Sequence, residues 1–532
     1  MRTRVFTSPK TSVLIQPQSI VARTFANFSS ATNGEGVLLS IHHRRLIAPT
    51  VHQDRLTALL IVLVAFTIRV TGLAHRALWY DELQSVTHAS LPFAQLLAGV
   101  HQFDPHPPLY YAQLHLWLRF GTSDFWIKLN SVFWSLLTVA SLYGVGGRRF
   151  GRQVGSYAAL LFALFPFAIA YAQEARMYAL LMFLGVWIYC FTDQLLYGRR
   201  VLWASCGLVS GTLAFLYSHG AGFLILFAVT SYSLYFLWKP PTQRQARWRR
   251  FRLWLALQLL ILLYYVPWLY RASTLSVRHT LQPDLPAITN TLSLLLLGFG
   301  ELAPWLRWGS VLVVLAILVG LYASDGPSRN ILLAFIVVPV GITLGISYLY
   351  RPIWLHRPLA FTVPFLALGL ALAVVRSRPL LATHRAGPPL RYGILALVGV
   401  VLTLAAANQQ ARTYYPWQIR EAAHFLQRAA QPGDRIFVAD FKVFWGVSWY
   451  FVGPGSVNPL QPDNAWAVRN GVTLLAGADD AGGPTAGSCD WLVYRTMDQL
   501  PPRNTLVVVQ AFDDLIVAQR CSPKARRTST TT

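Results

Sequence analysis

Apolar runs long enough to cross a lipid bilayer recur along the chain from Leu56 onward. A membrane-spanning helix needs about 20 predominantly apolar residues, and short polar or basic stretches separate these runs at that spacing. The sequence therefore predicts an α-helical multi-pass membrane protein with about eleven transmembrane helices. We place them near residues 56–73, 124–147, 155–173, 177–197, 201–218, 220–238, 253–270, 305–323, 331–350, 357–375 and 392–407.

The composition argues against a soluble protein. Of 532 residues, 54% are hydrophobic and only 12% are charged, and the mean hydropathy is +0.43. Soluble proteins carry about a quarter charged residues. A net charge of +24 raises the possibility of nucleic-acid binding. The basic residues, however, form short clusters between apolar runs, where membrane topology places them, so we expect no nucleic-acid partner.

The basic clusters also predict the orientation. They fall in alternate connections between the spans and include Arg148, Arg149, Arg199, Arg200, the segment 239–252, Arg329, Arg376, Arg378, Arg385 and Arg391. The positive-inside rule places these connections and the amino terminus on the cytoplasmic side. We expect the membrane to be the plasma (inner) membrane. The loop 74–123, the turn 172–178 and the tail after Asn408 then lie on the outer side.

The amino-terminal residues differ from the rest of the chain. The first fifty are rich in Ser, Thr, Asn and Arg, with Glu35 as the only acid, and show no sustained apolar period. We interpret residues 1–55 as a basic, disordered leader, followed by the transmembrane domain at 56–407. An organellar transit peptide shares this composition and stays open as an alternative.

The sequence pattern of residues 408–532 predicts a small outer α/β domain. A short amphipathic helix at 421–430 precedes a turn at Pro432-Gly433-Asp434. Apolar runs at 435–439, 490–495 and 504–510 are typical of strands. The Asp and Gly clusters around 476–484 are interpreted as loops and not as a metal site.

The chain has four cysteines, too few for a disulfide framework. Cys190 and Cys206 lie in apolar runs and are interpreted as packing residues. Cys489 and Cys521 lie in the tail, where an oxidising compartment would allow them to pair. Their spacing leaves the pairing open.

The first outer loop contains the candidate chemistry. It begins Leu78-Trp79-Tyr80-Asp81-Glu82-Leu83, continues through an amphipathic helix, and reaches Asp104-Pro-His106-Pro-Pro-Leu-Tyr110-Tyr111. A partly desolvated Asp at the membrane surface can act as a general base toward a hydroxyl. The neighbouring Tyr80 and Tyr110 would give a sugar ring a stacking platform. The alternative is that Asp81 and Glu82 only cap the following helix.

Further ionisable residues lie at the other predicted outer turns. Glu174, Arg176 and Tyr178 lie between two apolar spans, where charged groups are costly and become functional candidates. Arg176 suits a phosphate, because a guanidinium binds phosphate oxygens in bidentate fashion. A salt bridge with snorkelling is the alternative. His219 is a candidate substrate contact. Arg351 and Arg357 flank a short turn as interfacial anchors or lipid-phosphate ligands, with Arg357 the stronger candidate.

In this order, the Asp81-Glu82 pair, the D-x-H-P-P-L-Y-Y segment and the Q-E-A-R-x-Y-A-L segment resemble the GT-C superfamily of polyprenyl-phosphate-dependent membrane glycosyltransferases. Bacterial predicted membrane mannosyltransferases are the most similar group, alongside protein O-mannosyltransferases and the aminoarabinose transferases of lipid A. The resemblance is strongest over residues 56–220 and extends more loosely to about 376.

The resemblance implies that the chain transfers a mannose-like sugar, with inversion, from a polyprenyl phosphate to an acceptor hydroxyl of a glycan, lipid or protein at the outer membrane face. Asp81 would be the base, and Glu82 would orient it or the acceptor. Asp104 and His106 would position the sugar or complete the acid–base network. Glu174 and Arg176 would hold the active-site loop and the phosphate, and Arg357 would anchor the lipid phosphate.

The sequence departs from the family pattern at two places. Lys128 stands where an arginine is often found, and Arg357-Pro358-Leu matches the late Arg-Tyr-type pattern only loosely. No cofactor is required by the sequence, although the carboxylates at 81, 82, 104 and 174 leave a divalent cation possible.

Three other functions compete with a glycosyltransferase. A transporter or flippase would place ionisable residues at mid-membrane in broken helices and would show a repeat between halves. A non-catalytic scaffold would leave the acidic cluster unexplained. An O-antigen-type ligase or polymerase would carry a large outer loop late in the chain. The early acidic motifs favour the glycosyltransferase.

Overall fold

The structure is a computed structural model. It describes residues 51–104, 106–238, 244–274, 282–299, 304–376, 387–411, 418–456, 466–477, 484, 486–495, 507–512 and 515–522. Residues 1–50 of the predicted leader and most of the Asp and Gly clusters around 476–484 lie outside these ranges, whereas residues 51–55 begin the first described helix.

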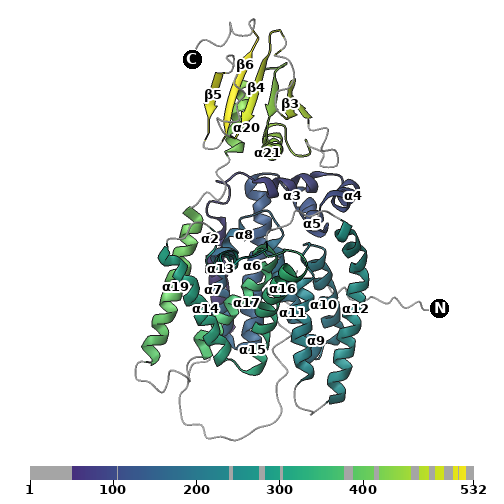
Figure 1. Ribbon diagram of the computed structural model, residues 1–532. Coiled ribbons are helices and arrows are strands. Elements are labelled where there is room, and N and C mark those ends of the chain that lie inside the picture. Colours follow the sequence, from purple (N-terminus) through teal and green to yellow (C-terminus); the bar gives the residue numbers. More distant parts are fainter. Residues whose placement is uncertain are drawn as a thin grey trace, which may run out of the picture. The chain divides into compact units, whose positions relative to one another are not determined.

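Helices make up the first three quarters of the described chain (Figure 1). They are α2 Val51–Val70, α3 Tyr80–Ser90, α4 Phe93–Phe103, α5 Leu109–Leu118, α6 Asp124–Phe150, α7 Arg152–Leu164, α8 Pro166–Ala172, α9 Tyr178–Tyr197, α10 Val201–Leu216, α11 Leu224–Leu237, α12 Arg244–Thr274, α13 Leu285–Leu297, α14 Pro304–Ala323, α15 Gly326–Leu332, η1 Leu333–Val337, α16 Val338–Leu349, η2 Arg357–Thr362, α17 Val363–Arg376 and α19 Gly387–Ala411.

Every span predicted from the apolar runs coincides with one or more of these helices. Within the described ranges, five helices are long and apolar enough to cross a membrane, or six if the bent pair α7 and α8 forms one span. The count of eleven therefore stays a prediction. The helix α13 was not predicted, because its continuous apolar stretch is shorter than the bilayer requires.

Local sequence explains two features that shape the bundle. The helices α6 and α7 pack closely through glycines: a Cβ on Gly155 would lie 2.6 Å from the carbonyl oxygen of Tyr143. The pair α7 and α8 bends by 63° at Phe165. Pro166 begins α8, where its missing N–H costs no helical hydrogen bond. The bend carries the chain into the turn at 173–177.

The predicted loop 74–123 is largely helical. Three short helices, α3, α4 and α5, follow one another at one end of the bundle (Figure 1). Leu83, Val86 and Leu96 are fully buried and join the apolar core of the bundle. The loop is therefore a packed layer against the helix ends, and it fixes the residues that it contains.

The C-terminal residues fold into two helices and a sheet (Figure 1). The elements are α20 Ile419–Ala429, β1 Arg435–Val438, α21 Phe441–Phe451, β2 Trp466–Arg469, β3 Val472–Ala476, β4 Cys489–Tyr494, β5 Val507–Ala511 and β6 Ile516–Cys521. The order in the six-stranded sheet is β2-β3-β1-β4-β6-β5, and β1 is parallel to both β3 and β4.

These elements have a hydrophobic core of their own, which includes Leu426, Ile436, Phe444 and Trp491. The predicted helix and the three predicted strands lie within one to three residues of α20, β1, β4 and β5, whereas α21, β2, β3 and β6 were missed. Cys489 and Cys521 face each other on β4 and β6 and form a disulfide. The domain limits and the outer location stay predictions.

Candidate active site

The predicted site residues come from five separate stretches of the chain, and three of these meet at the start of α3. Asp81 and Glu82 begin α3, Glu174 and Arg176 lie in the turn between α8 and α9, and Arg357 begins η2. The guanidinium Nη1 of Arg357 lies 2.8 Å from Asp81 Oδ2. Arg176 donates a hydrogen bond to the Asp81 carbonyl at 3.2 Å. Positions far apart in the sequence therefore meet at the start of α3.

Glu82 is fully buried and holds this arrangement together. Its Oε2 accepts a hydrogen bond from the Trp79 backbone N–H at 3.1 Å, and its Oε1 accepts one from the Ala175 N–H at 2.8 Å. The first bond is the helix-capping role that the sequence left open. The second ties the turn at 173–177 to α3. Both oxygens are occupied, so Glu82 positions the loops.

Asp104 is also buried, with 1% of its surface exposed. Its Oδ1 accepts a hydrogen bond from the His106 N–H at 2.7 Å, and its Oδ2 accepts bonds from the Tyr111 hydroxyl at 2.9 Å and from Gln84 at 3.2 Å. A carboxylate with both oxygens engaged is poorly placed to take a further proton. Asp104 therefore shapes the loop that presents His106.

Asp81 differs from these two carboxylates. Its side chain keeps 18% of its surface exposed. Arg357 binds one oxygen, Oδ2, and Oδ1 makes no hydrogen bond within the described part of the chain. Arg357 also lies over the ring of Trp79, with its Cζ 5.4 Å from the ring centroid. Asp81 is thus the loop carboxylate with an oxygen left to accept a proton.

Two histidines lie next to each other at the site. The rings of His106 and His219 are 4.7 Å apart, and Tyr178 lies 5.8 Å from His219. The Nδ1 atoms accept hydrogen bonds from the Gly220 N–H at 3.3 Å and the Ala221 N–H at 3.0 Å, respectively. Burial lowers the pKa of His219 to about 3 and that of His106 well below its usual value. Both rings are therefore neutral, and each carries its proton on Nε2, ready to donate to a hydroxyl.

The turn at 173–177 contains buried polar atoms that the described chain does not satisfy. Arg176 donates to the Ser85 hydroxyl at 2.9 Å, but its Nε has no hydrogen-bond partner among the described residues. Glu174 Oε1 is likewise without a partner there. Orphaned polar atoms in a buried site are rare and call for an explanation. A bound ligand with both donors and acceptors would supply the missing bonds.

Burial, and then the negative charge of Glu82, raise the pKa of Glu174 to about 7. The folded protein therefore holds a proton on Glu174 that the unfolded chain releases above pH 4.5. This contribution to stability is complete below pH 4.5 and is lost as the pH rises to about 7.

We expect Glu174→Gln to remove this loss, since the amide cannot ionise. The loss corresponds to roughly 3 kcal/mol over the full window. The gain in melting temperature over the wild type should thus be larger at pH 8 than at pH 4.5. Thermal unfolding of the purified protein at both pH values measures it, and an equal difference at both would contradict the ionisation.

The aromatic predictions have different outcomes. Tyr80 is partly exposed, with its ring 6.1 Å from that of Trp445 and 5.4 Å from Lys442 Nζ. Tyr110 is fully buried, so its ring has no exposed face in this structure, and its part in a stacking platform stays a prediction. Lys128 is buried too, and its Nζ donates to the Arg76 carbonyl at 2.6 Å. It stabilises the loop before α3.

The carboxylates do not converge on a metal in the described part of the chain. No group of three or more His, Cys, Asp and Glu side chains placed to bind an ion is found there. Asp81 points to Arg357, whereas Glu82 points to the Ala175 backbone. Asp81 is thus matched to a cation, and Glu82 and Asp104 are matched to hydrogen-bond donors.

Sequence reasoning missed several residues that contact the site. Ser85, Tyr111, Tyr171 and His356 line it, together with Gln84. Ser85 lies one helical turn after Asp81, a spacing that would have flagged it. His356 directly precedes Arg357. The others gave no signal in a single sequence.

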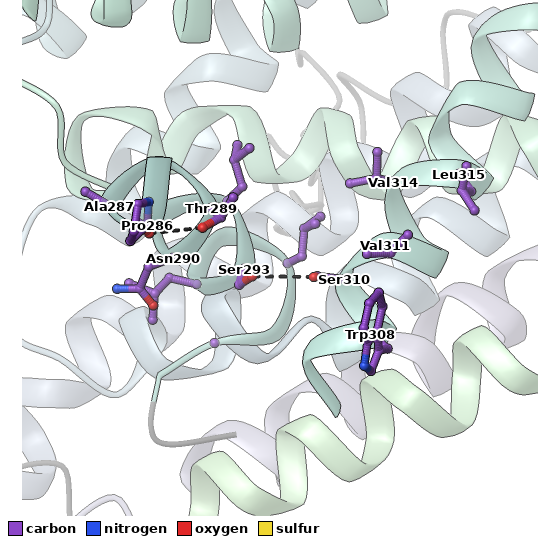
Figure 2. A pocket seen from close by; sticks show the side chains of 14 residues that line it. Pro286, Ala287, Thr289, Asn290, Ser293, Trp308, Ser310, Val311, Val314 and Leu315 are labelled. Atoms are coloured by element: carbon purple, nitrogen blue, oxygen red, sulfur yellow. Dashed lines mark hydrogen bonds between the residues drawn. The ribbon is translucent and has the colours of Figure 1, made fainter. Parts of the chain in front are cut away.

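A groove of about 950 Å³ lies between α13 and α14 (Figure 2). Its walls are mostly apolar, with Trp308, Val311 and Val314 on α14, and Ser293 and Ser310 facing each other at 3.4 Å. Gly298 also lines the groove. The next residue, Phe299, has its ring 5.2 Å from that of His356 and 5.4 Å from that of Tyr171. Aromatic contacts therefore connect the groove to the site.

Comparison with known proteins supports the resemblance seen in the sequence. The family model described as dolichyl-phosphate-mannose-protein mannosyltransferase matches residues 105–270. Crystal structures of ArnT from Cupriavidus metallidurans share the fold. The apo form has a TM-score of 0.58 at 14% identity and covers 87% of this chain and 97% of that one. The form bound to undecaprenyl phosphate has a TM-score of 0.57 at 15% identity and covers 88% and 98%.

No curated protein matches the sequence. The chain thus shares the helical fold of ArnT, and the resemblance to polyprenyl-phosphate-dependent membrane glycosyltransferases that the sequence predicted is confirmed.

Proposed function

We propose that the chain is a glycosyltransferase that moves a mannose-like sugar from a polyprenyl phosphate to an acceptor hydroxyl at the outer face of an inner membrane. The observation that carries the proposal is the hydrogen bonding of the Asp81 carboxylate. Among the three carboxylates of the loop, it is the one with an oxygen available for a proton, and a guanidinium stands beside it.

The reaction assigns a role to each group. Asp81 Oδ1 takes the proton of the acceptor hydroxyl as its oxygen attacks the anomeric carbon. The bond between that carbon and the phosphate oxygen breaks, and the phosphate leaves with the electron pair on the opposite face, which inverts the configuration. Arg357 and Arg176 stabilise the phosphate charge, and His106 and His219 donate hydrogen bonds to sugar hydroxyls.

The groove between α13 and α14 supports a lipid donor. Its apolar walls suit a polyprenyl tail, and Phe299, the residue after Gly298 in its lining, contacts the ring of His356, which directly precedes Arg357. The ArnT structure with undecaprenyl phosphate bound belongs to a protein of the same fold, which agrees with this class of donor.

The test is transfer by the purified full-length protein from a panel of radiolabelled polyprenyl-phosphate sugars, with membrane lipid, glycan and peptide acceptors. We expect label to move from one donor to one acceptor class, and the anomeric configuration of the product, read by NMR, to be inverted. Retention of configuration would overturn the single-displacement mechanism. Vesicle uptake or flipping of a donor without transfer would overturn the glycosyltransferase.

Filling the groove should weaken long donors selectively. We expect Val311→Trp to raise the KM for a long-chain polyprenyl donor at least about tenfold, since the indole occupies space that the tail needs and lost apolar burial costs about 25 cal/mol per Å². A short-chain donor should be unaffected. Val319→Trp is the matched control: Val319 is also exposed on α14 but does not line the groove. Equal effects on both chain lengths would contradict this assignment.

A further inference from the structure

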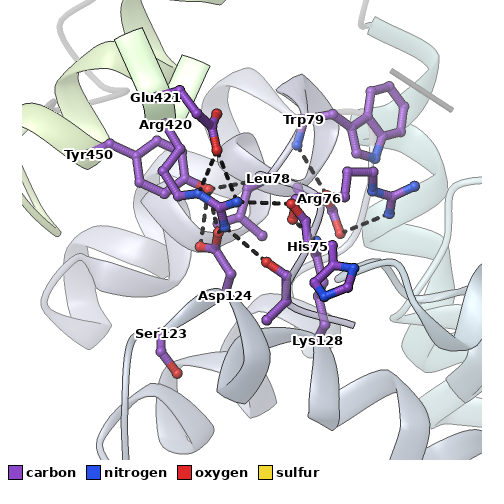
Figure 3. A network of polar contacts seen from close by, with 12 residues as sticks. His75, Arg76, Leu78, Trp79, Ser123, Asp124, Lys128, Arg420, Glu421 and Tyr450 are labelled. Atoms are coloured by element: carbon purple, nitrogen blue, oxygen red, sulfur yellow. Dashed lines mark hydrogen bonds and ion pairs between the residues drawn. The ribbon is translucent and has the colours of Figure 1, made fainter. Parts of the chain in front are cut away.

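The segment 74–79 between α2 and α3 has no regular secondary structure, yet side chains hold most of its backbone in place (Figure 3). Arg420 donates hydrogen bonds to the carbonyls of Ala74 at 2.9 Å and His75 at 2.8 Å. Lys128 binds the Arg76 carbonyl, and the Leu78 N–H donates to the hydroxyl of Tyr450 at 2.7 Å. Arg420 and Tyr450 belong to α20 and α21, more than three hundred residues later in the chain.

One carboxylate joins the two C-terminal side chains. Asp124, at the start of α6, accepts hydrogen bonds from the Tyr450 hydroxyl at 3.0 Å and from Arg420 at 2.9 Å. Glu421 accepts a further pair of bonds from the same guanidinium at 3.1 and 3.0 Å. The Asp124 side chain is only 9% exposed. Hydrogen bonds of this charged kind are the strong ones, and the burial of Asp124 shields its bonds from solvent.

The helix α21 also packs directly on the start of α3. A Cβ on Gly446 would lie 3.2 Å from the Leu83 side chain, and the rings of Trp445 and Tyr80 are 6.1 Å apart. The C-terminal fold therefore contacts both sides of the Asp81-Glu82 pair: the segment before it through Tyr450 and Arg420, and the residues around it through α21.

We propose that Tyr450 and Arg420 are positioning residues for the site: they fix the segment 74–79, and so set where the first turn of α3 presents Asp81. The inference rests on the proposed function. Asp81 lies three residues after Leu78, and α3 begins between them, so a shift of the Leu78 backbone moves the carboxylate. Misplacement by about 1 Å can cost about a hundredfold in rate.

The test variant is Tyr450→Phe, which removes one hydroxyl and keeps the ring. Tyr232→Phe is the matched control, because the Tyr232 hydroxyl also donates to an aspartate, Asp193, at 2.6 Å, away from the site. We expect Tyr450→Phe to lower kcat by about 10- to 100-fold with little change in the donor KM. Tyr232→Phe should keep the wild-type kcat. An unchanged kcat in Tyr450→Phe would overturn the proposal.

A second readout does not depend on activity. Hydrogen exchange of the full-length protein, followed by mass spectrometry, reports the amides of residues 78–83. We expect faster exchange there in Tyr450→Phe and not in Tyr232→Phe. Exchange at the wild-type rate in Tyr450→Phe would overturn the positioning role of Tyr450, even if the protein transferred no sugar. Absence of transfer by the wild type would instead count against the proposed function alone.

Arg420→Lys separates positioning from folding. Lysine keeps the charge beside Asp124 but lacks the planar fork that reaches both the Ala74 and His75 carbonyls. We expect a folded protein with a reduced kcat and faster exchange at 78–83. A lysine variant with the wild-type kcat and exchange would show that charge alone suffices, and would overturn the role of the fork.

Discussion

Replacing Asp81 with asparagine is expected to reduce sugar transfer by about 10²- to 10⁴-fold, the range that a general acid or base contributes. Asparagine keeps the size of the side chain and one hydrogen-bond acceptor for Arg357, but it cannot take the acceptor proton. Because Asp81 is partly exposed and packs into no core, the variant should fold. Transfer of radiolabel by wild type and variant, with thermal unfolding of both, measures the effect.

Asp54→Asn is the matched control. Asp54 also pairs with an arginine, since its Oδ2 lies 2.7 Å from Arg152, but it lies on α2 away from the site. Its loss should leave transfer unchanged. If Asp81→Asn were as active as the wild type, Asp81 would only cap α3, and Glu174 would become the next candidate for the base, because its Oε1 is also without a partner in the described chain.

The membrane helices could be predicted from the sequence because bilayer thickness imposes one strong rule on every span. Apolar runs near 20 residues are visible without any knowledge of the neighbouring helices. The helix α13 was not predicted, because the same rule rejects apolar runs that are too short to span the bilayer. The C-terminal sheet was harder: β2 and β3 are four and five residues long, and they are held by pairing, β3 with β1 on one side and with β2 on the other. Such short segments carry little signal by themselves.

The candidate site was predicted residue by residue but not as an arrangement. Scarce acids in an apolar chain mark Asp81, Glu82, Asp104 and Glu174 as unusual, since charges near a membrane are costly. The sequence did not reveal which oxygens would be free. The carboxylate oxygens of Glu82 and Asp104 accept hydrogen bonds from backbone N–H groups and a tyrosine. The difference from Asp81 arises only in the folded chain, where α3 meets the turn at 173–177.

For the same reason, a single sequence could not reveal contacts between residues that lie far apart in the chain. Arg357 and Asp81 are separated by 276 residues. Each was singled out separately, one as a phosphate ligand and the other as a base. Tyr450 and Arg420 gave no signal at all, because an aromatic or basic residue in an α/β domain is ordinary. Their role depends on Asp124 and on the backbone of 74–79.

In the proposed mechanism, the contact between Arg357 and Asp81 gives Arg357 two tasks. In the free protein its Nη1 binds the carboxylate at 2.8 Å. A guanidinium has five N–H donors, so it can bind an arriving phosphate and keep a bond to Asp81. In the proposed mechanism, the same cation would then orient the base and stabilise the leaving group. Arg176 stands beside it, with its Nε unbonded within the described residues.

Arg357→Gln is therefore expected to lower kcat/KM for the donor by about 10- to 150-fold, because a hydrogen bond to a charged group is worth about 1.5–3 kcal/mol. The donor KM should rise and kcat should fall together, since the phosphate is bound in the ground state and carries more charge as it leaves. Arg357→Lys should recover part of the loss, as it restores the charge but not the planar fork. Steady-state kinetics with varied donor concentration measures both.

Arg351→Gln is the control for charge at this turn, because Arg351 lies six residues earlier in the same basic stretch. It should change the donor KM by less than about twofold, as surface charges contribute about 0–1 kcal/mol. If Arg357→Gln left the donor KM unchanged and lowered kcat alone, Arg357 would act only by holding Asp81. The phosphate would then be bound by Arg176, whose substitution should raise the KM instead.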